Sequence, residues 1–157
     1  MKALIVYDTF FGNTEKVAQA MGEALGAVGE AQVVRVSEAS PEQISGVNLL
    51  IVGSPTRAFR PTSATVSFLR ALPADTLKGI RVAAFDTRTI MDEKVPAILR
   101  FMARIFGYAA KPIAARLRKK GGMLVASPEG FFVTGTEGPL ADGELERAAA
   151  WAKKMAG

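Results

Sequence analysis

The hydrophobic positions of the chain fall into short continuous runs, separated by longer segments in which they recur at a helical period. Most of the runs are apolar over the whole length of a strand, and one alternates as an edge strand does. The predicted strands are Ala3–Tyr7, the alternating Ala31–Val36, Asn48–Gly53, Ile80–Asp86, and a fifth in two pieces, Met123–Ser127 and Phe131–Gly135. Runs this apolar favour a parallel sheet that is buried on both faces.

The segments between the strands are predicted to be helices. Gly29 is expected to end the first helix, and the last is expected to begin near Asp142, which can cap it. Three further helices are predicted over Pro61–Leu72, over residues 95–106, and from Pro112 to the glycine pair at 121–122. The predicted buried faces are Val17, Met21, Ala24, Leu25 and Val28 in the first helix, and Leu145, Ala148, Ala149, Ala152 and Met155 in the last.

Strands that alternate with helices predict a right-handed, doubly wound α/β domain with helices on both faces of the sheet. At 157 residues, the chain suits a single domain over residues 1–157. Ligands of such sheets bind beyond the carboxyl ends of the strands, where the strand order reverses. The loops to inspect are therefore 8–14, 54–61 and 86–91.

The composition narrows the chemistry that these loops can perform. The chain has no cysteine and no histidine, which excludes thiolate nucleophiles and removes the commonest general base and metal ligand. A borrowed cofactor would then carry any reaction. The net charge of +5 suggests an anionic ligand, partner or surface. No apolar run is long enough to cross a bilayer and no signal peptide is evident, so a cytoplasmic protein is expected.

The first loop, Asp-Thr-Phe-Phe-Gly-Asn-Thr, joins a strand to a helix. Backbone N–H groups at a helix start favour a phosphate, and Thr9, Asn13 and Thr14 add polar side chains. The loop contains no lysine or arginine, which fits a phosphate monoester bound by neutral dipoles. The triphosphate pattern GxxxxGK[ST] and the dinucleotide pattern GxGxxG are both absent.

The stretch LIVYDTFFGNTEKVA resembles the signature of the flavodoxin family, and the order of elements matches over nearly the whole chain. GSPTRAF and FDTRT resemble the two loops that flank the flavin in that family. The resemblance implies a five-stranded sheet of order 2-1-3-4-5, the short-chain type and FMN as cofactor. It assigns the phosphate to Thr9, Phe10, Phe11, Gly12, Asn13 and Thr14, and the flavin ring to Pro55, Thr56, Arg57, Ala58, Phe59, Asp86, Thr87 and Arg88.

Three alternatives for function stay open. The first is an FMN-binding electron carrier, the second an FMN-dependent NAD(P)H:quinone or acceptor reductase, and the third a flavodoxin-like interaction module without FMN. A response-regulator receiver domain shares the topology, but its third strand would need to end in an aspartate, whereas here it ends in Gly53-Ser54. Two of the residues have an alternative to contact with the flavin: Phe59 can serve as a packing residue, and Asp86 can form a helix cap or a salt bridge.

Two departures from the family pattern bear on the site. The loop SPTRAFRPT has no glycine, so a flipped peptide that places a residue at positive φ would be costly there, and we expect the one-electron-reduced flavin to be poorly stabilised. The only tryptophan, Trp151, lies in the last helix, which leaves Phe59 as the candidate ring against the flavin.

The segment 94–120 is strongly basic, and no acidic residue occurs between Lys94 and Ser127. Residues 95–106 place Arg100 and Arg104 on one helical face and apolar residues on another. The plain expectation is a helix packed on the sheet with a solvated basic rim. The alternatives are docking of an acidic redox partner and peripheral contact with an anionic membrane. Nucleic acid is not expected, because no recognition motif accompanies the charge.

Overall fold

A single parallel sheet is built from the apolar runs of the sequence. The computed structural model describes residues 1–157. Its strands are β1 (Lys2–Tyr7), β2 (Glu30–Arg35), β3 (Leu49–Pro55), β4 (Arg81–Thr89), β5 (Met123–Leu124) and β6 (Glu129–Val133). The order is β2-β1-β3-β4-β5, with β6 also paired to β4, and every pairing is parallel. The predicted order 2-1-3-4-5 is confirmed, and the predicted broken fifth strand corresponds to β5 and β6.

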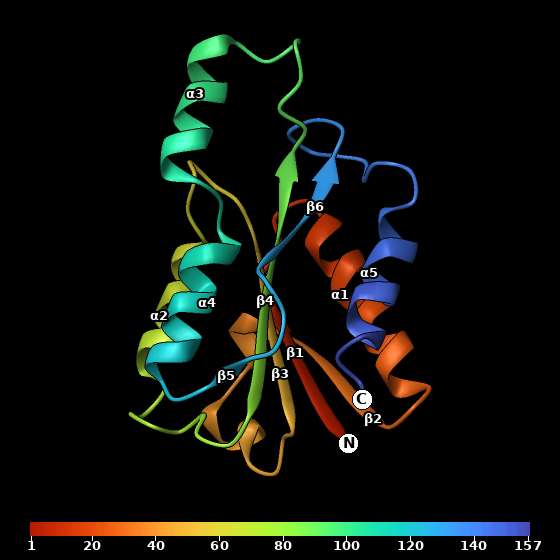
Figure 1. Ribbon diagram of the computed structural model, residues 1–157, viewed down its shortest axis with the longest axis vertical. Coiled ribbons are helices and arrows are strands. Elements are labelled where there is room, and N and C mark those ends of the chain that lie inside the picture. Colours follow the sequence, from red (N-terminus) through yellow and green to blue (C-terminus); the bar gives the residue numbers. More distant parts are fainter.

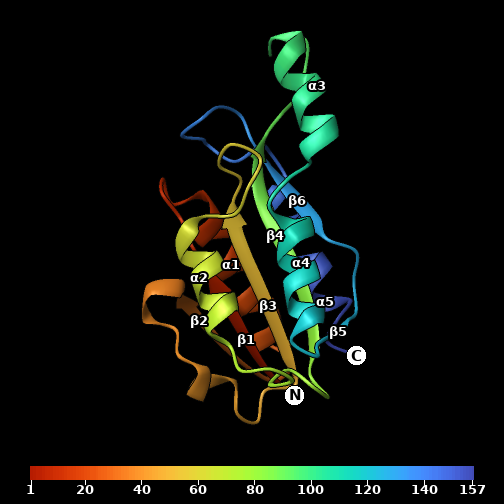
Figure 2. The same cartoon turned by 90° about the vertical axis from the view of Figure 1, so that its left-hand side faces the viewer.

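Helices cover both faces of this sheet (Figure 1). The five α-helices are α1 (Asn13–Gly26), α2 (Ser63–Ala71), α3 (Ala97–Phe106), α4 (Ala110–Lys119) and α5 (Glu144–Lys153), and short 3-10 helices span Val36–Glu38 and Pro41–Ile44. One face carries α1 and α5, which pack on each other, and the opposite face carries α2 and α4. Figure 2 shows the same layers from the side, with α3 standing beyond the end of the sheet. No helix is long and apolar enough to span a membrane.

The pleat of the strands divides the hydrophobic core in two. Leu4 and Val6 of β1 point to the layer of α2 and α4, whereas Ala3 and Ile5 point to the layer of α1 and α5. All four side chains are buried almost completely. Burial on both faces explains why these strands are continuously apolar rather than alternating.

Three sequence predictions about the helices are wrong. Helix α1 ends at Gly26, and Val28 lies beyond it with 61% of its surface exposed, so Val28 is not part of the buried face. Asp142 does not cap α5, because Gly143 is the N-cap residue at a φ of 82° and no side chain caps this end. Leu145 is 39% exposed. Glu144 is the first-turn side chain that turns inward, where its Oε2 accepts a hydrogen bond from the Phe132 N–H at 2.7 Å.

Strand β4 is longer than the sequence pattern predicts. It continues to Thr89, paired with β6 from Phe85 onward, so Asp86, Thr87 and Arg88 lie within the strand rather than in a loop. The predicted basic helix also differs from the plain expectation, because α3 does not pack on the sheet. The chain returns to the sheet only at α4, which begins at Ala110, two residues before Pro112.

Candidate functional site

The first loop leaves the backbone N–H groups at the start of α1 without protein acceptors. Gly12 adopts a φ of 90°, a left-handed conformation that glycine tolerates, and its N–H donates to Thr9 Oγ1 at 2.9 Å. No side chain caps α1, and the N–H groups of Asn13, Thr14 and Glu15 donate to no acceptor in the protein. These donors, together with the positive end of the helix dipole, form a site for an anion.

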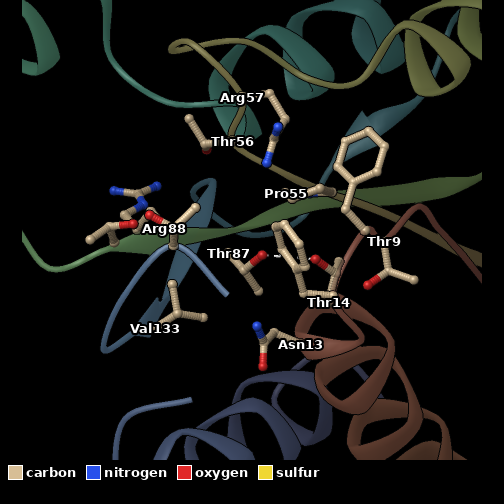
Figure 3. Close-up of a pocket in the computed structure, with 13 residues that line it drawn as sticks. Thr9, Asn13, Thr14, Pro55, Thr56, Arg57, Thr87, Arg88 and Val133 are labelled. Carbon is tan, nitrogen blue, oxygen red and sulfur yellow. Dashed lines mark hydrogen bonds between the residues drawn. The ribbon is translucent and has the colours of Figure 1, made fainter. Parts of the chain in front are cut away.

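A small cavity of about 50 Å³ lies against these donors. Its wall comes from the first loop, the ends of β3 and β4, and the segment after β6 (Figure 3). The lining residues are Thr9, Phe10, Phe11, Asn13, Thr14, Pro55, Thr56, Arg57, Thr87, Arg88, Thr89, Val133 and Thr136. Hydroxyl and amide side chains thus dominate a cavity that opens on a helix N-terminus, which suits a phosphate.

A buried hydroxyl pair fixes the floor of the cavity. Thr14 Oγ1 and Thr87 Oγ1 lie 2.7 Å apart and join α1 to β4 (Figure 3). The Thr56 N–H donates to the Thr87 carbonyl oxygen at 2.9 Å, which ties the loop after β3 to the same strand. Both threonines of the pair are at least 95% buried, so their positions are set by packing as well as by hydrogen bonding.

The rings of Phe10 and Phe11 lie partly exposed at the edge of the cavity and contact a cation. They are 57% and 46% exposed. The Arg57 guanidinium carbon lies 4.8 Å from the Phe10 ring centroid and 5.8 Å from that of Phe11. Arg57 forms no salt bridge, so its charge stays available at the mouth of the cavity. The site is therefore less neutral than the first loop alone predicted.

The turn after β3 contains two non-glycine residues at positive φ. Ala58 has a φ of 48° and Phe59 a φ of 67°. Two hydrogen bonds close the turn, Arg57 N–H to Arg60 O at 2.8 Å and Arg60 N–H to Arg57 O at 2.9 Å. This is the geometry of a type I′ hairpin turn, which usually contains asparagine or glycine. The sequence led us to expect a non-glycine residue at positive φ in this turn only after a peptide flip, but two such residues and the strain that they carry are already present.

Asp86 holds Arg88 and does not line the cavity. Its carboxylate is fully buried and accepts from Arg88 Nε at 2.7 Å, from Arg88 Nη2 at 2.8 Å, and from the Ala110 N–H at 2.9 Å. Burial raises the pKa of Asp86, and the Arg88 guanidinium opposes that rise. The alternative of a salt bridge and cap is therefore what the structure contains, and the expected direct contact between Asp86 and a ligand is not supported.

The guanidinium of Arg88 also positions an aromatic ring. It stacks on Tyr108 with 3.8 Å between the guanidinium carbon and the ring centroid. Tyr108 lines a second cavity of about 190 Å³, which shares Thr56, Arg88 and Thr89 with the first. The other residues of this cavity are Ala58, Phe59, Met91 and Leu99. Phe59 packs on Phe106 of α3, with ring centroids 5.9 Å apart, so both its predicted roles stay open.

Sequence reasoning found ten of the residues that line the first cavity and missed Thr89, Val133 and Thr136. The missed residues belong to the paired ends of β4 and β6, where Thr89 lies opposite Val133. The predicted strand piece Phe131–Gly135 could have indicated these residues, because parallel neighbouring strands end at the same edge of the sheet. Tyr108 was missed because α3 separates it from β4 in the sequence.

A comparison with protein families shows the family of the chain. The model of the family described as Flavodoxin matches residues 5–151. The chain belongs to the flavodoxin family. It is accordingly an FMN-binding electron-transfer protein, and the anion site at the start of α1 is chemically suited to the phosphate of FMN. The resemblance drawn from the first loop is confirmed.

Solved structures of flavodoxins share the fold over almost the full chain. A flavodoxin from Archaea is 20% identical with a TM-score of 0.77, covering 99% of this chain and 96% of that one. A short-chain flavodoxin associated with a bacterial microcompartment is 17% identical with a TM-score of 0.77, covering 100% and 99%. Flavodoxin 1 from Bacillus cereus is 17% identical with a TM-score of 0.75, covering 97% and 95%. No curated protein matches the sequence.

Proposed function

We propose that the phosphate of FMN binds in the small cavity at the start of α1. The observation that carries this proposal is the set of unpaired N–H groups of Asn13, Thr14 and Glu15 beside buried threonine hydroxyls. Phe10 and Phe11 add two further main-chain N–H groups that have no acceptor in the protein. A phosphate needs several donors at once, and five amides with a helix dipole supply them without a lysine.

The flavin ring would lie across the second cavity. Thr56, Ala58 and Phe59 would line one side of it, and Thr87, Arg88 and Tyr108 the other. Tyr108 then supplies a second aromatic ring beside Phe59, and Arg88 holds it in place. Asp86 acts as a positioning residue through Arg88.

Bound FMN supplies the electron chemistry, and the chain has no cysteine that could form a redox-active disulfide. The chain's own groups bind and orient the cofactor. The amides and hydroxyls of the first loop would anchor the phosphate end. Arg57, free of any carboxylate, would favour negative charge near the cavity mouth. Electron transfer then depends on how closely a partner approaches this end of the protein.

We infer that the protein is an electron carrier of one flavodoxin-like domain, residues 1–157, with an acidic protein as partner. Arg57 and Arg60 are both exposed at the turn beside the flavin position, and neither forms a salt bridge. Opposite charge across an interface speeds association and favours the short-lived complexes that electron transfer needs. Docking at this turn would place the partner next to the flavin.

A reductase is the second candidate, and one observation favours it. A third cavity of about 460 Å³ adjoins the proposed flavin position at Met91 and Tyr108, and its apolar lining, which includes Phe101, suits an apolar acceptor beside the flavin. Rapid NADPH oxidation by the FMN-loaded protein, with a quinone as acceptor, would support this candidate. Failure to oxidise NADPH, with rapid reduction by a ferredoxin-type reductase, would support the carrier.

The binding proposal is tested with two matched threonine variants. Thr14 and Thr65 each lie in a buried hydroxyl pair at 2.7 Å, Thr14 with Thr87 and Thr65 with Thr62, but only the first pair lines the cavity. We expect Thr14→Val to weaken FMN binding about tenfold, measured by quenching of FMN fluorescence, because one hydrogen bond to a charged group is lost. Thr65→Val should leave the affinity unchanged. Equal effects of the two variants would contradict the proposed position of the phosphate.

A further inference from the structure

Helix α3 presents a large apolar surface that nothing in the protein covers. Of its ten residues only Ala103 is buried. Ile98, Phe101 and Ile105 are 62%, 56% and 61% exposed. Figures 1 and 2 both show α3 projecting past the carboxyl ends of β4 and β6, away from the other helices. A protein of this size rarely leaves so many large apolar side chains of one helix in water without a partner.

The helix is also amphipathic and cationic. Ile98, Phe101 and Ile105 follow one another at spacings of three and four residues and so share one side of α3. Arg100 and Arg104, four residues apart, lie on another side. No acidic residue occurs between Lys94 and Ser127, so the cations of α3 and of the neighbouring α4 are not neutralised within this segment.

We propose that α3 docks the protein on an anionic lipid surface. A bilayer with anionic headgroups offers negative charge at its surface and hydrocarbon directly behind it. Phe101 and Ile105 would enter the boundary between headgroups and acyl chains, while Arg100 and Arg104 reach the phosphates through their long side chains. This pairing of an apolar face with cations is the pattern of helices that lie in a membrane interface.

The charge of the chain argues against a second copy as the occupant. Two copies that met through α3 would bring Arg100 and Arg104 of each close together, on proteins that each carry a net charge of +5. An acidic protein would satisfy the cations but needs an apolar surface of its own for Ile98, Phe101 and Ile105. The anionic bilayer supplies both kinds of contact at any point of its surface.

The docking goes beyond electron transfer and does not depend on bound FMN. It does have a consequence for the site, because α3 stands at the same end of the sheet as the two cavities. Phe106 of α3 packs on Phe59 of the turn after β3, so a membrane held by α3 would lie near that turn. An electron acceptor dissolved in the lipid would then be within reach of the flavin end.

The test is flotation of the full-length protein with lipid vesicles. Vesicles of phosphatidylglycerol and phosphatidylcholine in equal parts should carry the wild-type protein upward, and vesicles of phosphatidylcholine alone should not. Arg100→Gln with Arg104→Gln should lower the partition coefficient about thirtyfold, the effect of two cations near an anionic surface. Phe101→Ser with Ile105→Ser should lower it about a hundredfold.

Matched controls come from exposed residues elsewhere in the chain. Val28→Ser removes an apolar side chain that is 61% exposed in the turn after α1. The double variant Lys153→Gln with Lys154→Gln removes two exposed cations. Both controls should float as the wild type does, and circular dichroism should show every variant folded. The proposal is overturned if wild-type protein stays unbound, if binding ignores lipid charge, or if the controls lose as much binding as the α3 variants. A dimer that Phe101→Ser with Ile105→Ser dissociates, or capture by polyglutamate without capture by vesicles, would also overturn it.

Discussion

Replacing Arg88 by leucine leaves the buried carboxylate of Asp86 without its cation. In the folded protein Asp86 is fully buried, and Arg88 is its one ion-pair partner, through two hydrogen bonds of 2.7 and 2.8 Å. Leucine keeps the apolar stem that covers part of Tyr108 but cannot donate. Only the Ala110 N–H, at 2.9 Å, would still donate to the carboxylate.

The expected loss of stability follows from this geometry. Removing one partner of a buried ion pair costs roughly 3–5 kcal/mol. Arg88 is 20% exposed and one backbone donor remains, so we expect the lower end, about 3 kcal/mol at pH 7. For a chain of this length each kcal/mol lowers Tm by about 2–4 °C, which gives a fall of about 6–12 °C.

The loss should depend on pH in a defined direction. Burial already holds the pKa of Asp86 above its ordinary value, and without Arg88 the pKa would rise further. A carboxyl whose pKa is higher in the folded than in the unfolded state stabilises the fold below the unfolded pKa. That contribution is lost as pH rises through the folded pKa. The gap in stability between wild type and Arg88→Leu should therefore be smaller at pH 5 than at pH 7.

Urea unfolding at the two pH values measures this gap, with Arg70→Leu as a control, because Arg70 is exposed and forms no salt bridge. Asp86→Leu with Arg88→Leu should recover most of the lost stability, since an apolar pair can replace a buried ion pair at little cost. The reasoning is refuted if Arg88→Leu costs less than about 1 kcal/mol at pH 7, or if the double variant is less stable than the single one.

Three further outcomes are expected. Arg57→Gln should weaken FMN binding about fivefold at low salt, because Arg57 lines the first cavity. Arg60→Gln, across the same turn but outside that cavity, should leave the affinity unchanged. Both affinities are measured by fluorescence titration, and equal values for the two variants would show that the Arg57 charge does not contribute to binding. Ala58→Gly should raise the free energy of unfolding by about 0.5 kcal/mol, because glycine relieves a φ of 48° but loses more entropy on folding; a destabilised variant in urea would argue against strain in this turn. Glu144→Gln should cost about 2 kcal/mol at pH 7, because Arg147 and then the Phe132 N–H hold the pKa of Glu144 below its usual value. A carboxylate whose pKa is lowered in the folded protein contributes stability that is lost as pH falls through that folded pKa. The Tm of the wild type should therefore approach that of Glu144→Gln below about pH 4, and a difference in Tm that persists there would contradict the role given to Glu144.

The buried strands were predictable because each is apolar along its whole length, whereas their order followed from the resemblance to the flavodoxin family. Leu49, Leu50, Ile51 and Val52 are all completely buried, as successive residues of a strand are when the sheet is covered on both faces. Helix ends were less predictable. Gly26 and Gly29 both permit a helix to end, and the local sequence does not say which one does, so the sequence pattern extends the predicted buried face to Val28, beyond the end of α1.

The donors of the proposed phosphate site could be listed from the sequence because they are local in it. Residues 9–14 form one turn into one helix, and the family signature lies in that turn. The flavin end was not predictable in this way, because its geometry depends on contacts between distant residues. Asp86 and Arg88 are two residues apart in β4 and so lie on the same side of the strand. Asp86 also accepts a hydrogen bond from Ala110, which is separated from β4 in the sequence by the whole of α3. The sequence also could not predict that α3 is exposed, because its apolar residues recur with the same spacing as those of an amphipathic helix that packs on a sheet.

The binding of FMN through its phosphate is the central claim, and the most direct test is a comparison of FMN with riboflavin, which lacks the phosphate. Purified apoprotein would be titrated with each in turn, with quenching of flavin fluorescence as the signal. The amides of Phe10, Phe11, Asn13, Thr14 and Glu15 predict one FMN per chain, bound at least about a hundredfold more tightly than riboflavin. Equal affinity for the two flavins, or no binding of FMN, would contradict the account.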